Sequence, residues 1–477
     1  MVFRISSLFG LGQYKTPPSG AGGLFIMQVW KFGGTSVGKP ERMHSIKNLI
    51  TQDGKQKFVV LSALSGTTNA LLSIAESLYA NNDTEATGKI DSLYAHYQSF
   101  IKELYKTEAA QEKGQAIIDN EFGFIRSLVK IKPFTLKQEK EIAAEGEILS
   151  TQLFTAYLEE EGVKCVLLPA LEFMRIDADD EPMLDFLDEK LGEMLKYHTE
   201  KEIIVTQGYI CRNPRGEVDN LKRGGSDYTA SLIGAAIYAG EIQIWTDIDG
   251  MHNNDPRIVK RTFPVRELSF EEAAELAYFG AKILHPFTIR PARLRNIPVR
   301  LLNTMQPAAP GTLISNQTVN QEIKAIAAKD GITSIQIRSA RMLLAYGFMR
   351  KVFEIFENYK TPVDMITTSE VAVSLTIDNT THLAEIQAEL ERFSTVYVDT
   401  DQSIICIVGD FTFNKNGIVT RVLDALSNIP LRMVAYGGSE HNTSVLIPTE
   451  YKAQALNALN ERLFFYEEAM KTIFTAP

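Results

Sequence analysis

The sequence predicts a large α/β domain with a mostly parallel sheet, followed by a repeat of two smaller α+β units. Short apolar runs rich in β-branched residues alternate with helical stretches as far as residues 300–320. Such alternation is typical of parallel strands joined by crossover helices. Beyond that point, strands and helices recur in a similar order over two similar lengths, which makes an internal repeat. Paired units of this size usually form a small-ligand sensor or a dimer interface.

In the first domain, the clearest strand is the continuous apolar run 58–63, Phe-Val-Val-Leu-Ser-Ala, which is typical of a buried parallel strand. The other expected strands are 28–32, 164–168, 202–206 and 242–246, and the expected helices are 68–80, 86–130, 137–160, 227–239 and 270–278. We assign residues 27–315 to this domain. Residues 1–26 contain Pro17, Pro18 and a glycine-rich run without periodicity. We expect them to be a disordered extension, with Met27 as the functional start.

The repeat is expected to occupy residues 316–395 and 396–470. The elements expected in the first unit are strands 323–328 and 333–338, helix 347–359, and strands 362–368 and 371–377. Those expected in the second unit are strand 403–408, helix 416–427, strands 431–437 and 443–447, and helix 450–462.

Composition and charge exclude several classes of function. The 477 residues carry a formal net charge of −10, which argues against binding of nucleic acid or of an anionic membrane surface. No apolar stretch approaches the roughly 20 residues needed to span a bilayer. Cys165, Cys211 and Cys406 lie too far apart in sequence for a metal motif or a disulfide framework. They are expected to be buried thiols in a reducing cytoplasm.

The first motif that carries chemistry is Lys31-Phe-Gly-Gly-Thr-Ser-Val-Gly-Lys-Pro40. Gly33 and Gly34 follow a strand, so backbone N–H groups there can approach phosphate oxygens closely, and Lys31 adds a positive charge. The segment nearly matches a P-loop, but Pro40 stands where the loop needs a hydroxyl for Mg²⁺, so we reject that interpretation. A tight structural turn with a surface lysine remains the alternative.

The second motif is Arg223-Gly-Gly-Ser-Asp-Tyr-Thr-Ala230, which leads into a predicted apolar helix. A helix N-terminus that carries a guanidinium is a natural anion site. The alternative is plain N-capping by Ser226 or Asp227. That alternative leaves the preceding Arg-Gly-Gly unexplained.

Three further segments have a possible function and a plain structural alternative. Trp245-Thr-Asp-Ile-Asp-Gly250, with Asn254-Asp-Pro-Arg257, lies where parallel sheets bind ligands, but Asp-Gly and Asp-Pro are also ordinary turn pairs. Glu147 of Glu145-Gly-Glu147 borders an uncharged stretch and could receive an ammonium group, or it could face solvent. Lys282, in the segment 279–286, could reach a nucleotide or simply end a helix.

Taken together and in this order, these segments resemble those of aspartate kinases from about Met27 to residue 465. Val-Leu-Ser-Ala with Thr68-Asn69 adds to the match. The resemblance implies an amino-acid-kinase-type three-layer αβα domain followed by two interleaved, ferredoxin-like ACT domains. The segment Asp364-Met-Ile-Thr-Thr-Ser-Glu370 resembles the effector-binding segment of the lysine-inhibited type.

The resemblance implies a transfer of the ATP γ-phosphoryl group to the β-carboxylate of L-aspartate, with Mg²⁺, and feedback inhibition, with lysine as the expected inhibitor. It also implies a homodimer or a larger homo-oligomer through the ACT domains. Lys31 and Asp227 would be catalytic. Aspartate would be bound by Ser62, Thr68, Glu147, Arg223 and Ser226. ATP would be bound by Lys31, Gly33, Gly34, Thr246, Asp247, His252, Arg257 and Lys282. The effector would be bound by Met342, Phe348, Val363, Asp364, Thr368, Ser369 and Glu370.

Three residues depart from the family's pattern. His252 replaces a common Tyr at the nucleotide base, Lys222 replaces a Gly before Arg223, and Ala345 replaces a Ser of the lysine-inhibited type. The alternatives are a kinase acting on glutamate or acetylglutamate, and a degenerate kinase domain kept as an amino-acid sensor. No dinucleotide-binding glycine fingerprint follows the repeat, so a fused dehydrogenase is not expected.

Overall fold

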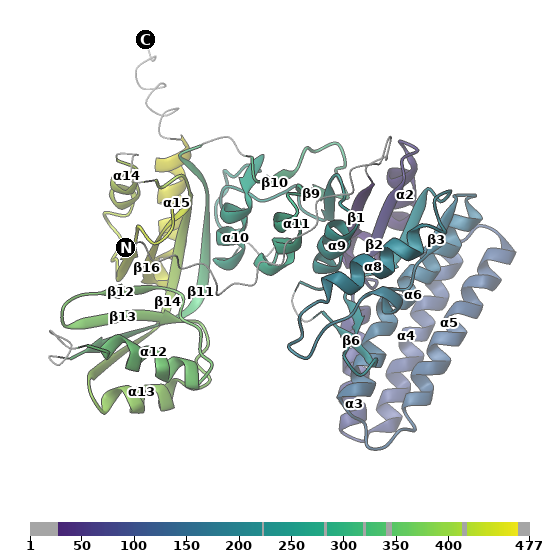
Figure 1. Ribbon diagram of the computed structural model, residues 1–477, viewed down its shortest axis with the longest axis horizontal. Helices are drawn as coiled ribbons and strands as arrows, with labels where there is room; N and C mark the ends of the chain where they lie inside the picture. Colours follow the sequence, from purple (N-terminus) through teal and green to yellow (C-terminus); the bar gives the residue numbers. More distant parts are fainter. Residues whose placement is uncertain are drawn as a thin grey trace, which may run out of the picture.

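The structure is a computed structural model that describes residues 27–221, 224–280, 284–317, 321–339, 346–412 and 417–465. A larger α/β part and a smaller part dominated by strands lie side by side along the long axis of the molecule (Figure 1). Among the described residues, no helix is both long and apolar enough to cross a bilayer. Cys165, Cys211 and Cys406 are buried free thiols, as the sequence predicts.

The larger part is built on an eight-stranded sheet in the order β3-β4-β2-β1-β7-β9-β10-β8. All neighbouring strands are parallel except β9 and β10. The strands are β1 Gln28–Phe32, β2 Lys57–Leu61, β3 Cys165–Leu167, β4 Ile203–Gln207, β7 Ile242–Thr246, β8 Glu267–Ser269, β9 Val299–Asn303 and β10 Thr312–Ser315. A separate hairpin comprises β5 Ile210–Arg212 and β6 Val218–Asn220. The predicted mostly parallel sheet is confirmed.

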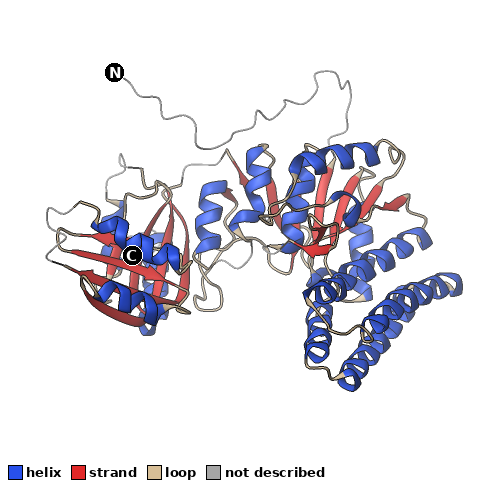
Figure 2. Ribbon diagram, turned by 60° about the horizontal axis from the view of Figure 1, so that its bottom comes forward, coloured by secondary structure: helices blue, strands red, loops and turns tan. Residues whose placement is uncertain are grey.

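Helices cover both faces of this sheet, which makes three layers (Figure 2). The α-helices are α1 Gly34–Val37, α2 Pro40–Thr51, α3 Thr67–Tyr79, α4 Asp83–Leu104, α5 Glu108–Leu128, α6 Leu136–Glu160, α7 Ala170–Phe173, α8 Leu184–Leu195, α9 Gly225–Ala236, α10 Phe270–Tyr278 and α11 Arg290–Leu294, with the 3-10 turn η1 Pro286–Ile289. Strand β2 explains the layering, because alternate side chains of a strand point to opposite faces. Phe58 and Val60 join the core cluster of α9, whereas Val59 and Leu61 join that of α3 and α6.

The helix predicted over 86–130 is wrong as a single element, because the chain turns between α4 and α5 at Tyr105–Thr107. The Thr107 side chain caps α5 by accepting the N–H of Ala110 at 3.3 Å. The Tyr105 ring lies against Gly114, where a Cβ would come within 2.3 Å of it, and its hydroxyl donates to the Leu153 carbonyl at 2.9 Å. Thr107-Glu108 was the local signal for this helix start.

The smaller part is one six-stranded antiparallel sheet in the order β12-β13-β11-β14-β16-β15. Its strands are β11 Ile323–Arg338, β12 Ile366–Thr368, β13 Ala372–Ile377, β14 Thr395–Gly409, β15 Met433–Ala435 and β16 Asn442–Pro448. Its helices are α12 Phe348–Asn358, α13 Leu383–Glu391, α14 Ile418–Ala425 and α15 Lys452–Asn460, with the short turns η3 Thr449–Tyr451 and η4 Glu461–Phe465.

The two units of the repeat share their central strands. The strands predicted at 323–328 and 333–338 are one strand, β11, with register shifts against β14 between Lys329 and Ser334. One half of each long strand packs against α12 and α13, and the other half packs against α14 and α15. The predicted division at 395/396 therefore falls at the start of β14, a strand that both units use.

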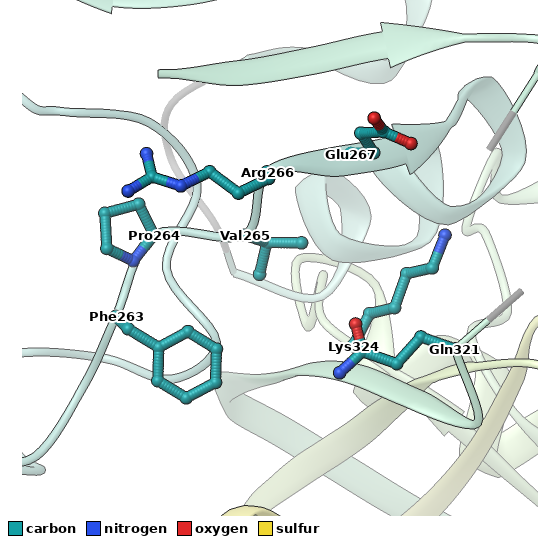
Figure 3. Close-up of a pocket in the computed structure, with 7 residues that line it drawn as sticks. All are labelled: Phe263, Pro264, Val265, Arg266, Glu267, Gln321 and Lys324. Atoms are coloured by element: carbon teal, nitrogen blue, oxygen red, sulfur yellow. The ribbon is translucent and has the colours of Figure 1, made fainter. Parts of the chain in front are cut away.

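Helix α10 joins the two parts. Near its start, Glu272 forms a buried ion pair of 2.8 Å with Lys324 of β11, and the side chains are 6% and 2% exposed. Lys324 also lines a cavity of about 400 Å³ between the segment Phe263–Glu267 and the start of β11 (Figure 3). Just beyond the helix, a Cβ on Gly280 would lie 2.1 Å from the Ala328 carbonyl oxygen, so the two parts touch backbone to backbone.

We predict that Lys324→Met lowers the free energy of unfolding by about 3–5 kcal/mol, because it leaves the Glu272 carboxylate buried without its partner. Adding Glu272→Gln should recover much of the loss, since the amide retains its oxygen for the Ser269 N–H. Thermal unfolding of both variants checks this. Lys190→Met is the control, because it removes an exposed pair of the same length, 2.8 Å, and should cost less than about 1 kcal/mol. A Lys324→Met loss as small as the control's would contradict the prediction.

Candidate active site

A pocket of about 650 Å³ lies where the carboxyl ends of β1, β2 and β7 meet the N-terminus of α9. Ligands bind at this edge of open α/β sheets because loops and helix N-termini converge there. The pocket is lined by residues from six separate parts of the chain: Gly34, Thr35, Ser62, Ala63, Leu64, Ser65, Gly66, Thr68, Asn69, Glu147, Tyr209, Gly225, Ser226, Thr246 and Asp247. Seven of the predicted site residues are among them: Gly34, Ser62, Thr68, Glu147, Ser226, Thr246 and Asp247.

The glycine turn after β1 is held tightly against the neighbouring strand ends. The Gly33 N–H donates to the Trp245 carbonyl at 3.3 Å. A Cβ on Gly34 would lie 3.0 Å from the Ala63 carbonyl oxygen, so a larger residue would push the turn away from β2. The Ser36 hydroxyl lies 2.7 Å from that of Thr304, which fixes the turn to the end of β9. In this motif the backbone therefore packs closely against the neighbouring strand ends beside a pocket, and the motif is not an exposed turn.

Lys31 and Asp227, the two residues predicted to be catalytic, form an ion pair of 2.6 Å at the side of this pocket. Their side chains are only 12% and 18% exposed. The pair joins β1 to the first turn of α9, where the helix dipole favours the carboxylate. The Lys31 ammonium group is thus held at the carboxyl end of β1 by a largely buried carboxylate partner.

The start of α9 depends on glycine. Gly224 is the N-cap with φ of +69°, and a Cβ there would lie 1.8 Å from Cγ2 of Thr288. Because Gly224 is the N-cap and no side chain caps the helix, the interpretation of Ser226 or Asp227 as the cap is wrong. Gly225 and Ser226 of this first turn line the pocket, and the Ser226 hydroxyl accepts that of Ser62 at 2.9 Å. Arg223 lies outside the described residues.

Glu147 extends from α6 into the pocket, although it is only 4% exposed. Its Oε1 accepts the Ala63 N–H at 3.3 Å, and its Oε2 has no hydrogen-bond partner within the described part of the chain. Burial raises the pKa of Glu147 to about 7. The other glutamate of the motif, Glu145, lies away from the pocket beside Glu121, and burial followed by repulsion from Glu121 raises its pKa to about 9. Of the two glutamates of the motif, Glu147 is therefore the one that lines the pocket.

A second pocket of about 410 Å³ adjoins the first, because Thr246 and Asp247 line both. Its lining comprises Thr246, Asp247, Ile248, Gly250, His252, Asn254, Asp255, Pro256, Arg257, Leu276, Gly280, Ile326, Ala327 and Ala328. All predicted nucleotide residues of the segment 246–257 are in it. One of its walls is formed by strand β11, so the antiparallel sheet of the smaller part closes a pocket of the α/β domain.

The charged side chains of this second pocket have local partners. His252 Nε2 lies 2.7 Å from Asp249 Oδ1, and its Nδ1 lies 3.0 Å from the Thr262 hydroxyl. Arg257 pairs with Asp255 at 2.7 Å, and with 74% of its side chain exposed it can swing toward a ligand. Lys282, the remaining predicted nucleotide residue, is not among the residues that the structure describes.

Comparison with known proteins gives the family. Residues 27–303 match the amino acid kinase family, and residues 405–463 match the ACT domain. The lysine-sensitive aspartokinase 3 of Escherichia coli is 33% identical over 448 residues, which cover 91% of this chain and 99% of that protein. The chain belongs to the aspartokinase family. The predicted family, fold class and kinase activity are thereby confirmed.

Two solved aspartokinase structures have the same architecture. Aspartokinase III of E. coli in complex with aspartate and ADP, called the R-state, covers 92% of this chain and 100% of its own at 32% identity, with a TM-score of 0.78. The same enzyme in complex with lysine and aspartate, called the T-state, gives a TM-score of 0.74 at the same identity and coverage.

Some pocket residues of this aspartokinase were not predicted from the sequence. Tyr209 lines the first pocket in a left-handed conformation, φ +68°, with its N–H donated to the Thr229 hydroxyl at 2.9 Å. Its position two residues after β4, at a strand's carboxyl end, was a usable signal. No local sequence signal indicated the wall formed by Ile326–Ala328, because the contact between β11 and the kinase domain joins residues far apart in sequence.

The predicted effector residues divide into buried and exposed groups. Asp364 is buried, with its side chain 1% exposed. Phe348 and Val363 belong to the apolar core between α12 and α13. Thr368, Ser369 and Glu370 are exposed around the end of β12. Met342 lies outside the described residues.

Proposed function

We propose that this chain transfers the γ-phosphoryl group of ATP to the β-carboxylate of L-aspartate, giving 4-phospho-L-aspartate. The observation that carries the proposal is the pair of adjoining pockets, which meet at Thr246 and Asp247 beside the Lys31–Asp227 pair. A nucleotide in the second pocket would direct its phosphates toward the glycine turn and the N-terminus of α9. The acceptor would then lie in the first pocket. A related aspartokinase structure in complex with aspartate and ADP is the precedent for binding both ligands together.

The acceptor pocket has groups that suit an amino acid. The unpaired Oε2 of Glu147 suits the substrate's ammonium group, and Arg223 is the proposed partner of its α-carboxylate. Thr68 and the Ser62–Ser226 hydroxyl pair suit the β-carboxylate, because hydroxyls donate to an anion without removing its charge. Gly33, Gly34, Thr246, Asp247, His252, Arg257 and Lys282 are proposed to hold ATP.

The reaction requires alignment and charge neutralisation rather than a strong base. A carboxylate is already a nucleophile at neutral pH, so no group of the chain has to remove a proton. A β-carboxylate oxygen forms a bond to the γ-phosphorus, while the bond to the β,γ-bridging oxygen breaks and ADP leaves with the electron pair. Lys31 stabilises the charge on the transferring group, and Asp227 keeps the lysine in place between turnovers.

Mg²⁺ is the proposed metal, bound together with the nucleotide. Among the described residues, no group of three or more His, Cys, Asp or Glu side chains forms a metal cluster. Mg²⁺ suits such a site, because it is commonly held by one or two carboxylates, substrate phosphates and water. Asp247, at the junction of the two pockets, is the best-placed carboxylate, and the ion would neutralise phosphate charge.

The smaller part is proposed to bind L-lysine as a feedback effector and to join two or more copies of the chain. The effector segment follows the lysine-sensitive relative, with Asp364, Thr368, Ser369 and Glu370 as its polar groups. The edge strand β12 leaves backbone groups open to pairing, and the neighbouring Ile366 and Val371 are 38% and 46% exposed. Cytoplasmic localisation stays a prediction.

An assay of ATP turnover with aspartate, glutamate or acetylglutamate as acceptor tests the function. We expect turnover with aspartate, and trapping of the product with hydroxylamine should identify an acyl phosphate. Each reaction is repeated with lysine and with threonine. Faster turnover with either other acceptor would refute the assignment of aspartate. Insensitivity of the aspartate reaction to both effectors would refute feedback control alone.

We predict that Lys31→Met lowers kcat by at least about 10²–10³-fold, which is the range for losing one group that stabilises transition-state charge. The matched control is Lys39→Met, which removes the exposed lysine of the P-loop-like match in the same segment. It should leave kcat within about threefold. Near-normal turnover by Lys31→Met would show that Lys31 is not the lysine that stabilises the transferring phosphate. An inactive Lys39→Met enzyme with a native circular dichroism spectrum would contradict the assignment as well.

The raised pKa of Glu147 predicts a pH dependence for the binding of aspartate. Below about pH 7 the carboxyl group is protonated and cannot pair with an ammonium group, so the KM for aspartate should fall as pH rises through 7 and then level off. The KM for ATP should not follow this curve. Glu147→Gln should raise the KM for aspartate by about 10–100-fold and abolish its pH dependence. A sloping profile that persists in Glu147→Gln would place the titrating group elsewhere.

A further inference from the structure

Four side chains meet at the contact between α10 and the regulatory sheet. The Tyr278 hydroxyl, on the last residue of α10, donates to Asp364 Oδ1 at 2.6 Å. Lys329 of β11 reaches the same oxygen at 3.0 Å and also pairs with Asp378 at 2.8 Å. The Lys329 ammonium group lies 4.4 Å from the centre of the Tyr278 ring. A residue of the proposed effector segment is therefore bonded directly to the kinase domain.

The charges in this cluster do not balance. Two carboxylates face one ammonium group, which leaves one negative charge in excess at neutral pH. The Asp364 side chain is 1% exposed, and its Oδ2 has no hydrogen-bond partner among the residues that the structure describes. A buried carboxylate oxygen without a partner costs free energy, which a cationic ligand would recover. The excess charge and the unpaired oxygen therefore favour a cationic ligand at Asp364.

The same cluster lies directly behind the second pocket. Tyr278 lies between Leu276 and Gly280, and Lys329 follows Ala328; these three neighbours all line that pocket. Gly280 and Ala328 are already in backbone contact, since a Cβ on Gly280 would meet the Ala328 carbonyl at 2.1 Å. A shift of Tyr278 or Lys329 would consequently move two walls of the proposed nucleotide site. Burial first, and then the bond to Asp364, raises the pKa of the Tyr278 hydroxyl, so it remains a donor.

We propose that Asp364 is shared between two competing partners, and that an effector's ammonium group displaces Tyr278 and Lys329 from it. Without effector, Asp364 holds both residues and so positions α10 and β11 against the nucleotide. With effector, the carboxylate turns to the ligand, and the nucleotide pocket loses its support. Tyr278 and Lys329 are positioning residues in this scheme. The inference rests on the proposed function, because it takes the segment 364–370 as the effector site.

Two features of the cluster favour a cationic amino acid over a neutral one. The excess negative charge is offset by lysine, which carries a net positive charge, but not by threonine. Lys329 already presents to Asp364 the primary ammonium group that a lysine effector would bring. The internal lysine thus occupies the ligand's place, and its removal should raise affinity for the effector rather than lower it.

Calorimetric titration with lysine and with threonine, alongside steady-state kinetics, tests the competition in the full chain. In Tyr278→Phe, which removes only the competing hydroxyl, lysine should bind about 3–10-fold more tightly than in the wild type. Its KM for ATP without effector should rise, while its KM for aspartate should stay unchanged. Lys329→Met should tighten lysine binding further. Threonine should bind more weakly than lysine throughout.

Tyr94→Phe is the matched control. It removes a tyrosine–carboxylate hydrogen bond of 2.5 Å, to Asp119 between α4 and α5, on the far side of the kinase domain. Its lysine affinity and its KM for ATP should both equal those of the wild type. If Lys329→Met does not fold, Tyr278→Phe decides the question, because it leaves every charge of the cluster in place.

The outcomes separate the competition from the proposed function. Unchanged or weaker lysine binding in Tyr278→Phe, in a chain whose wild type binds lysine and phosphorylates aspartate, overturns the competition and leaves the function standing. A wild type that phosphorylates aspartate but binds neither effector overturns both the feedback role and the competition. A shift of the KM for ATP in Tyr94→Phe as large as in Tyr278→Phe would also overturn it, since any lost bond would then act alike.

Discussion

The ion pair between Lys31 and Asp227 is the contact around which the proposed active site is assembled. It joins the first strand of the sheet to the first turn of α9, two elements almost 200 residues apart in sequence. A lysine at this edge without a carboxylate would repel neighbouring cationic groups, and a carboxylate without a lysine would repel phosphate. Paired, the two side chains keep a cation beside the proposed phosphate site without adding net charge to it.

This pairing dictates several features of the surrounding chain. Asp227 can reach β1 only if α9 begins close to the strand ends, which requires the left-handed Gly224 and its tight contact with Thr288. The first turn of α9 also packs closely against Gly208, which follows β4. A Cβ at Gly208 would lie 2.3 Å from the Ser226 hydroxyl, so this contact requires glycine. The glycines of the motifs thus serve packing and function together: they let three strand ends and a helix N-terminus share one small volume.

Local signals in the sequence were sufficient for much of this. Continuous apolar strands, glycine turns at their carboxyl ends and a Glu-x-Glu helix predicted the sheet, the edge at which the pocket lies, and Glu147, which lines that pocket. The uncharged stretch after Glu147 favoured it over Glu145, but local signals could not show which tertiary neighbours the two carboxylates meet: Glu121 for the first and Ala63 for the second. They also could not reveal that one long strand, β11, serves both regulatory units, since its register shifts depend on its partner β14.

The same limit applies to regulation, where the residues that matter are identified by contact rather than by motif. Tyr278 belongs to an ordinary amphipathic helix and Lys329 to an ordinary strand, and neither shows a pattern that suggests control. Their positions acquire meaning because α10 touches β11 at both of its ends, through Glu272 with Lys324 and through Tyr278 with Lys329. Because α10 is held at both ends, a displacement of one end would tilt the whole helix and would not be absorbed by a loop. Since Leu276 lies on that helix and lines the second pocket, a tilt would reach the proposed nucleotide site within a single element.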